Sequence, residues 1–590
     1  MVRPLPIRSA ARVMTLAFVV ACLAASCLVT FAESSALDAL RESDPALSYP
    51  VAQYAIDPAQ KQLWLSALDS PEVDMQRMAA ETIARSQEVN GSNLVEAVPS
   101  LERILEAKAS HPAARFAAAR ALVVLNSRDS SGKLLEASKS YGSDLRLLIE
   151  PTLAEWDYEP ARSVWLGRLS EQASRRRELI LAVRGLGVVR EQKALNPLLE
   201  IINDSRRHPD VRFEAATAVG QISATGLETQ ADKLARSPGT PTSLNRLCAI
   251  QMLLTHETAA AAQLLSAWAT DDEPLIAATA MRRLNALDSA LMLSLAEMAL
   301  RHPDARIRSE GIESCITHPT TDKTGALGRL LADPDPALRE KTREGLLRLS
   351  SVAELKPVVN DVVKGHLQSD DWKGQEQAAI LAGGIDLEEV ANRLVELLES
   401  PRVEVKSASA WALRKVAVKE TIPAILQIAK NQTELRKAGT GTVVDEQVAH
   451  LLETLGVLKA TEAIPLLKEY IPKHYPMGVQ SRSAAIWALG VMPREEADAE
   501  LEDALMDRIL DFADRPPEMP EVKQMSAISL ARMKSTSQAE RLRGLAVNVP
   551  LSVELGVALR WAVKELTGEE LPPPTPVPVP AEDWFLVPLQ

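Results

Sequence analysis

The side chains in this chain that could ligate a metal ion or act as nucleophiles are scattered, with eight histidines and four cysteines in 590 residues. Three of the histidines, His111, His208 and His302, each stand directly before a proline in a similar local sequence. A histidine that recurs at the same turn of successive segments marks a repeat rather than a metal site. The sequence also lacks a Cys-x-x-Cys pair, a zinc-protease helix, a phosphate-binding glycine loop and a Gly-x-Ser-x-Gly elbow. We therefore predict no catalytic residue, no metal site and no cofactor.

The histidine turns belong to a sequence motif that recurs with a period near 34 residues. In each copy a basic residue precedes an apolar anchor residue by seven positions, and small residues fill the interval, as in residues 111–122 and 208–219. A fixed period of this size is typical of a solenoid, in which each unit packs on its neighbours. Successive anchors are 28 to 42 residues apart, and they are Ile83, Leu122, Leu153, Leu186, Val219, Leu253, Met281, Cys315, Leu346, Ala382, Leu413, Leu455, Leu489, Leu530 and Val563.

A second apolar stretch lies between successive anchors. In residues 194–202, 421–428 and 463–470 the apolar positions recur at helical spacing, so each unit should contain two helices. Prolines such as Pro112 and Pro209 stand where the second helix would begin, because a missing N–H costs little there. We predict an all-α solenoid of about 14–15 two-helix units.

These features together resemble the HEAT repeat family, especially its short-unit branch related to phycobilisome lyase repeats. The resemblance rests on the Pro/Asp turn, the Val211-Arg212 pair and the Ala-Leu-Gly ending at 488–490, and it covers roughly residues 71–568. It implies a right-handed solenoid whose second helices line a concave face. It also implies a structural ladder in which turn aspartates pair with basic residues of neighbouring units, each pair contributing about 1 kcal/mol or less. The residues of that ladder would be Arg115, Arg212, Arg308, Arg339, Lys406, Arg482, Lys523, Asp210, Asp304 and Asp335.

One position of the unit carries a candidate binding signal. The residue two positions before the anchor lies about 200° around the helix from it, so we expect that residue to face solvent on the concave side. In the last third of the chain this position holds Trp411, Trp487 and Trp561. Exposed tryptophan is enriched at binding hot spots, which makes these three residues candidate partner contacts. The alternative is that each ring packs against a neighbouring unit. In most other units the position is polar: Glu81, Arg120, Arg184, Thr217, Gln251, Thr279, Glu313, Glu344 and Glu453.

The first 32 residues have the layout of an export signal. Three arginines precede an uncharged run from Val13 to Ala32, and a small residue ends it. Three fates remain open: cleavage, retention as a membrane anchor, or lipidation at Cys22. We expect an exported protein, periplasmic or associated with the envelope, that touches a membrane only through residues 1–32 if these are retained or lipidated.

The remaining chain divides into an amino-terminal cap at 33–70, the solenoid at 71–568 and a proline-rich tail at 569–590. Residues 431–446 lengthen one unit and contain Gly439 and Gly441, which predicts a protruding loop. The tail ends in an apolar tip at Trp584 to Leu586. We expect the tip to fold back onto the last repeat or to dock on a partner, so Trp584 is a further candidate contact.

Charge and fold together suggest a binding function. The net charge is −13, and −16 without residues 1–32, which disfavours nucleic acid and favours basic partners. Cys248 and Cys315 lie in units two apart, so we expect two buried free thiols. We predict a non-catalytic protein-binding scaffold of the cell envelope that uses its concave face, with the partner unidentified. Two alternatives are an enzyme or accessory subunit of the lyase-like type, and a tethered spacer that binds through its carboxy-terminal tip.

Overall fold

The computed structural model describes residues 45–49, 58–91, 93–170, 175–237, 242–439, 444–494, 496–512, 516–548, 553–572 and 584–586. Within these residues the regular secondary structure is helical and no β-strand occurs, which confirms the all-α prediction. The predicted export segment at 1–32 lies outside the described residues, as does most of the proline-rich tail.

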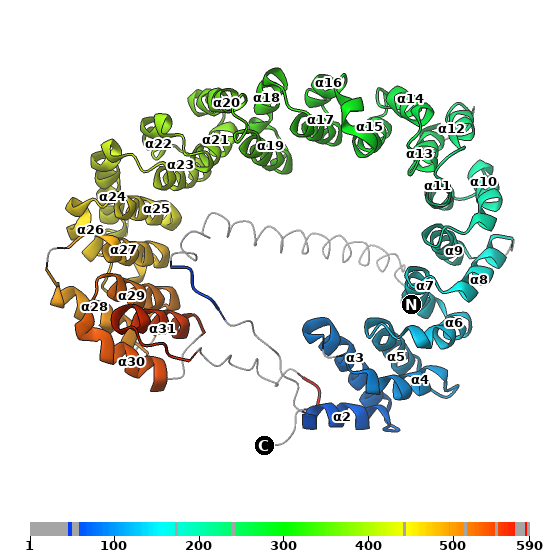
Figure 1. Ribbon diagram of the computed structural model, residues 1–590, viewed down its shortest axis with the longest axis horizontal. Helices are drawn as coiled ribbons and strands as arrows, with labels where there is room; N and C mark the ends of the chain where they lie inside the picture. The colour runs from blue at the N-terminus through cyan, green and yellow to red at the C-terminus, as the bar shows by residue number, and fades with distance from the viewer. Residues whose placement is uncertain are drawn as a thin grey trace, which may run out of the picture. The chain divides into compact units, whose positions relative to one another are not determined.

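The chain forms two compact units. The amino-terminal unit comprises residues 52–358 together with 577–590, and the carboxy-terminal unit comprises residues 359–576 together with 1–51. Within each unit, helices alternate between two layers, and the second helix of every repeat lies on the inner side of the curved row (Figure 1).

In the amino-terminal unit, the first helices of the repeats are α2 (Pro58–Leu68), α4 (Val98–Glu106), α6 (Ser131–Ser140), α8 (Glu159–Ser170), α10 (Leu195–Asn203), α12 (Glu228–Ala235), α14 (Ala259–Trp268), α16 (Ala296–Leu300) and α18 (Thr321–Gly328). The second helices are α3 (Val73–Asn90), α5 (Pro112–Val124), α7 (Ser143–Glu155), α9 (Arg176–Val188), α11 (Pro209–Ile222), α13 (Thr242–Met252), α15 (Pro274–Asp288), α17 (Ala305–Thr317) and α19 (Pro336–Leu349).

In the carboxy-terminal unit, the first helices are α20 (Lys356–Gln368), which begins just before the boundary, α22 (Ala391–Leu397), α24 (Ile422–Lys437), α26 (Ile464–Lys468), α28 (Ala499–Leu510) and α30 (Ala539–Asn548). The second helices are α21 (Trp372–Gly384), α23 (Val403–Val416), α25 (Asp445–Val457), α27 (Val479–Val491), α29 (Pro520–Arg532) and α31 (Val553–Thr567).

The predicted anchors form the centre of the core. Every anchor from Ile83 to Val563 has an exposed fraction of 0%. Each lies in a second helix except Leu253, which directly follows α13. Alanines around the anchors are also buried, and their small side chains let neighbouring helices approach closely.

Seven second helices end in the same turn, which the sequence did not reveal. In these units the residue four positions after the anchor has a φ between 45° and 58°, in the left-handed region. In six of them the next backbone N–H bonds back to the anchor carbonyl, as in Ser127 N–H to Leu122 O at 3.0 Å and Ala460 N–H to Leu455 O at 3.0 Å. This geometry closes the end of the second helix. Glycine usually marks such a turn, but here the left-handed residues are Asn126, Asp157, Arg190, Asp386, Ala417, Lys459 and Lys534.

The prediction of a loop over 431–446 is wrong for most of that segment. Helix α24 continues to Lys437 and α25 begins at Asp445. The added helical turns face the next repeat: Thr433 Oγ1 lies 2.7 Å from the Tyr470 hydroxyl, and Arg436 donates to Ser481 Oγ at 3.0 Å. Thr433 and Arg436 are buried by these contacts, which hold the insertion as helix.

The two terminal segments contact different units. Tyr49 accepts a hydrogen bond from Gln524 of α29 at 2.8 Å, within the carboxy-terminal unit. The tip at 584–586 packs against the core of the amino-terminal unit, next to α2 and α3. The expectation that the tip folds onto the last repeat is therefore wrong. The buried indole of Trp64 on α2 offers it an aromatic surface instead.

Candidate functional site on the inner face of the second helices

The polar residue seven positions before the anchor holds the two helices of one repeat together. Arg115 donates to the carbonyls of Leu105 and Ala107 at 3.2 and 2.7 Å, at the end of α4. Arg482 donates in the same way to Tyr470 and Ile471, both at 3.2 Å. The last carbonyls of a helix have no partner within the helix, so the side chain satisfies groups that would otherwise be buried unpaired.

Several members of this set also contact the next repeat. Arg212 donates to Ile202 O at 2.8 Å and to Asn245 Oδ1 at 2.6 Å. Arg308 makes two bonds to the carboxylate of Asp333, at 2.7 and 2.8 Å. The expected ladder between neighbouring units thus exists, but its acceptors are not the turn aspartates named from the sequence.

The turn aspartates have local roles. Asp304 and Asp335 accept from the backbone N–H of Arg306 and Ala337, both at 2.9 Å, and so begin α17 and α19. Asp210 pairs with Arg176 of the preceding repeat, at the exposed rim. Each of these turn aspartates stands at the start of its own second helix. Its carboxylate therefore lies closer to the first backbone N–H groups of that helix than to the buried arginine one turn further along.

The remaining predicted members differ in their contacts. Arg339 donates to the carbonyls of Asp333 and Pro334 at 2.9 and 3.3 Å. The Lys523 ammonium lies 3.5 Å from the ring centroid of Phe512, and burial lowers its pKa. Lys406 is half-buried.

Sequence reasoning missed four residues at this register. Arg146 and Gln375 donate to Ser138 O at 2.8 Å and Ser369 O at 2.6 Å, and Gln76 donates to Ser70 O at 2.7 Å. Arg246 pairs with Asp271 of the next repeat. The seven-residue spacing to the anchor could have identified these residues. The search would have needed to accept glutamine at that position as well as arginine and lysine.

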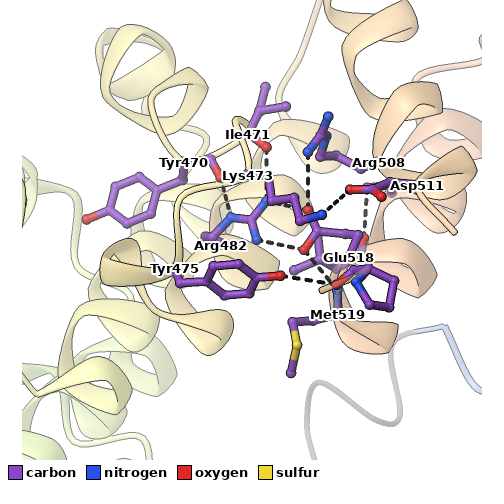
Figure 2. A network of polar contacts seen from close by, with 12 residues as sticks. Tyr470, Ile471, Lys473, Tyr475, Arg482, Arg508, Asp511, Glu518 and Met519 are labelled. Atoms are coloured by element: carbon purple, nitrogen blue, oxygen red, sulfur yellow. Dashed lines mark hydrogen bonds and ion pairs between the residues drawn. The ribbon is translucent and has the colours of Figure 1, made fainter. Parts of the chain in front are cut away.

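The most enclosed member of the ladder is Arg482 on α27. Figure 2 shows its guanidinium facing the carboxylate of Glu518, which precedes α29, with bonds of 2.8 and 2.7 Å. Both side chains have exposed fractions of 0%. Lys473 and Asp511 form a further ion pair beside them at 2.7 Å.

The environment of Glu518 favours its ionised form. Burial by itself would raise the pKa of Glu518, but the bonds from Arg482 and from the Met519 N–H at 2.9 Å outweigh it and lower the pKa. A carboxylate with a lowered pKa contributes stability above the pKa of an unfolded glutamate, and that contribution is lost as pH falls through the folded value. Arg482 and Glu518 therefore stabilise the fold as a charged pair at neutral pH.

The expectation that the tryptophan register faces solvent is wrong in the carboxy-terminal unit. Trp411 and Trp487 have exposed fractions of only 7%, and Trp561 is half-buried. Glu453, at the same register, is fully buried and pairs with Arg414 at 2.9 Å. Trp411 and Trp487 pack against neighbouring units, as the alternative interpretation of this register predicted. Their burial does not favour a partner contact through this register.

Glycine in the preceding second helix makes room for each buried ring. A Cβ added at Gly383 would lie 2.6 Å from Trp411 Cζ3, and one added at Gly456 would lie 2.8 Å from Trp487 Cζ3. Both glycines directly follow an anchor. The register before Trp561 holds Ala531 instead, in accord with the greater exposure of that ring.

A different register is apolar and exposed in the amino-terminal unit. Six positions before the anchor, six consecutive second helices from α5 to α15 carry a large apolar residue, and we call this set the inner apolar row: Phe116, Leu147, Ile180, Phe213, Leu247 and Leu275. The exposed fractions of Phe116, Leu147 and Leu275 are 38%, 45% and 41%. The other three are half-buried against the core.

The row faces the inner side of the unit. A second helix is covered by its own first helix and by the second helices on both sides, so its exposed face is the inner one (Figure 1). Polar residues two positions before the anchor lie one helical turn further along the same face. Two of these are arginines that pair with neighbouring repeats: Arg120 with Glu88 at 2.9 Å, and Arg184 with Glu214. The apolar row is therefore bordered by a polar one.

The other sequence candidates take structural roles. His111 and His302 accept from backbone N–H groups at 3.2 and 3.0 Å, and His208 contacts Asp210. Cys248 and Cys315 are buried free thiols, as predicted, and burial raises the pKa of Cys248 to about 11. Within the described residues, no group of three or more His, Cys, Asp or Glu side chains could hold a metal ion, and no helix is long and apolar enough to cross a membrane.

Comparison with known proteins supports the repeat assignment. The family model described as HEAT repeats matches residues 359–441. Over these residues the chain is similar to HEAT repeats. Its α-solenoid fold is similar to that of a chain in the structure of Kap95p with RanGDP, with 13% sequence identity, 87% of this chain and 72% of that chain covered, and a TM-score of 0.53. Yeast importin-beta (Kap95p) gives 14% identity, coverage of 87% and 73%, and a TM-score of 0.49. No curated protein matches the sequence.

The buried pair in Figure 2 yields a stability prediction. Arg482→Ala should lower the free energy of unfolding of the carboxy-terminal unit by about 3–5 kcal/mol, because Glu518 would stay buried without its partner. Replacing both residues, as in Arg482→Met with Glu518→Met, should recover part of that loss, because no charge stays buried without a partner but the Tyr470 and Ile471 carbonyls still lose their donor. Urea unfolding of the single and double variants measures both effects. A single variant within about 1 kcal/mol of the wild type would contradict the assignment.

The contact between Gly383 and Trp411 yields a second stability prediction. Gly383→Ala should destabilise the fold by about 1–3 kcal/mol, since the added methyl group meets the indole and the backbone of α23, with Ala412 Cα at 3.0 Å. Gly365→Ala on α20 is the matched control: no atom lies within 4 Å of its added Cβ. That control should stabilise by about 0.5–1 kcal/mol through helix propensity. Thermal unfolding compares the two, and equal shifts would rule out close packing at Gly383.

Proposed function

We propose that this HEAT-repeat protein is a non-catalytic, protein-binding scaffold of the cell envelope, and that its amino-terminal unit binds a partner along the inner apolar row. The observation that carries the proposal is the row itself. Six consecutive repeats present a large apolar side chain at one register, and three of these side chains are about two-fifths exposed. A continuous exposed apolar surface bordered by polar residues is typical of an interaction site.

The fold supports a binding role of this kind. Kap95p, which has a similar fold, binds RanGDP. A solenoid presents a large preformed surface, so little conformational entropy is lost when a partner binds. Phenylalanine and leucine on that surface can serve as anchors that a partner covers.

The row also constrains the chemistry of the partner. Adjacent helices lie about 8–10 Å apart, so six residues span roughly 40–50 Å. An α-helix rises by about 10 Å every seven residues, so a helix with one apolar stripe can place a side chain against each repeat in turn. The chain carries a net charge of −13, which favours a basic partner. We therefore infer that the occupant is a basic amphipathic helix of another protein.

The row can be tested by affinity capture with residues 33–590 as bait. The triple variant Phe116→Ser, Leu147→Ser and Leu275→Ser should reduce affinity for the captured partner by at least about tenfold, because it removes the most exposed members of the row. The control triple Val95→Ser, Val403→Ser and Val547→Ser removes side chains exposed by 56%, 47% and 56% that lie outside the row. This control should bind like the wild type.

A photo-crosslinking residue at position 147 then tests the contact directly. It should join the bait to an amphipathic helical segment of the partner. Unchanged affinity of the row variant, or the absence of any crosslink from position 147 to the captured partner, would reject the inner row as the binding surface.

The envelope location rests on residues 1–32. Three arginines followed by the uncharged run from Val13 to Ala32 are typical of an export signal. The mature protein should be recovered outside the cytoplasm, and its intact mass should correspond to a chain that begins after Ala32. A full-length chain in the membrane fraction would indicate an anchor, and an acylated chain beginning at Cys22 would indicate a lipoprotein. A full-length cytoplasmic protein would contradict export.

A further inference from the structure

The tip at 584–586 lies in a small aromatic site on α2 and α3 of the amino-terminal unit. The indole of Trp584 stacks on that of Trp64 of α2, with ring centroids 5.6 Å apart and planes inclined by 24°. The guanidinium of Arg85 of α3 lies 5.1 Å from the centroid of the Trp584 ring. One aromatic side chain is thus recognised by both stacking and a cation–π contact.

The backbone of the tip is recognised as well. The Trp64 indole N–H donates a hydrogen bond to the carbonyl of Phe585. Leu586 has a φ of 51°, a left-handed conformation that costs a leucine about 1–2 kcal/mol and therefore needs surrounding contacts to hold it. The three tip residues are half-buried and pack against the core of the amino-terminal unit.

The site lies where a stack of repeats needs a cover. Each internal repeat is covered by a neighbour on both sides, and a terminal repeat requires a cap. Trp64 belongs to the first repeat, yet its exposed fraction is 0%. The tip contributes to that burial by covering the Trp64 ring.

We propose that Trp64 and Arg85 form a peptide-binding site, and that the tip at 584–586 is its intramolecular ligand. The site selects an aromatic residue by stacking and cation–π contact, and the bond to the next carbonyl sets the register of the peptide. Its ligand class is a Trp-Phe-Leu sequence whose leucine adopts a left-handed backbone conformation. The proposal is independent of the inner apolar row, which lies on other helices.

Displacement of the tip tests the site. A fluorescein-labelled peptide of residues 581–590 should bind saturably to full-length Trp584→Ala protein, as measured by fluorescence anisotropy. The wild type should bind the same peptide at least about tenfold more weakly, because its own tip competes intramolecularly for the site. Val188→Ala, which removes an exposed apolar residue elsewhere in the same unit and outside the inner apolar row, should behave like the wild type.

A substitution at Arg85 tests recognition of the peptide without disturbing the core, because the Arg85 side chain is exposed. Adding Arg85→Ala to Trp584→Ala should weaken peptide binding by about twofold to fivefold, and Arg85→Lys should preserve more of it. Hydrogen exchange gives a second readout: backbone amides in residues 58–68 should exchange faster in Trp584→Ala than in the wild type. The absence of saturable binding to Trp584→Ala, equal binding to the wild type, or unchanged exchange would overturn the proposal.

Discussion

The carbonyl groups at the carboxyl end of each first helix are the constraint on which the repeat depends. They have no partner inside the helix and they lie against the second helix, where water is excluded. A long polar side chain seven positions before the anchor satisfies them, as Arg115 and Arg482 do. Burying a guanidinium in turn requires an acceptor, and the next repeat supplies it through Asn245, Asp333 or Glu518. These three repeats are therefore completed by their neighbours.

The inner faces of the two units differ because different side chains occupy the same registers of their second helices. Glycine follows the anchor in both units, as at Gly187 and Gly383, and lets the next helix approach closely. In the carboxy-terminal unit, Trp411 and Trp487 pack against such glycines and are enclosed. In the amino-terminal unit, a different register points away from the neighbours and carries the inner apolar row, with Phe116 and Leu147 exposed. The same repeat thus produces a closed surface in one unit and an exposed apolar surface in the other.

The ends of the stack need partners that the repeat itself does not provide. The first repeat obtains cover from the last residues of the chain, through Trp584 on Trp64. Tyr49, which precedes α2 in the sequence, contacts α29 of the carboxy-terminal unit instead. The two units therefore each include a segment from the opposite end of the sequence.

The sequence by itself determined the two-helix period, the all-α class and the buried anchors from Ile83 to Val563, because burial on a helix follows directly from spacing. It also located the register of Arg482, although not its acceptor. Only the tertiary structure decided that Trp411 is enclosed, that residues 431–437 continue a helix, and that Trp584 packs on the first repeat. Spacing shows which residues share a helix face. How closely the next helix approaches, and which distant segment covers an end, depend on packing between elements that are separate in sequence.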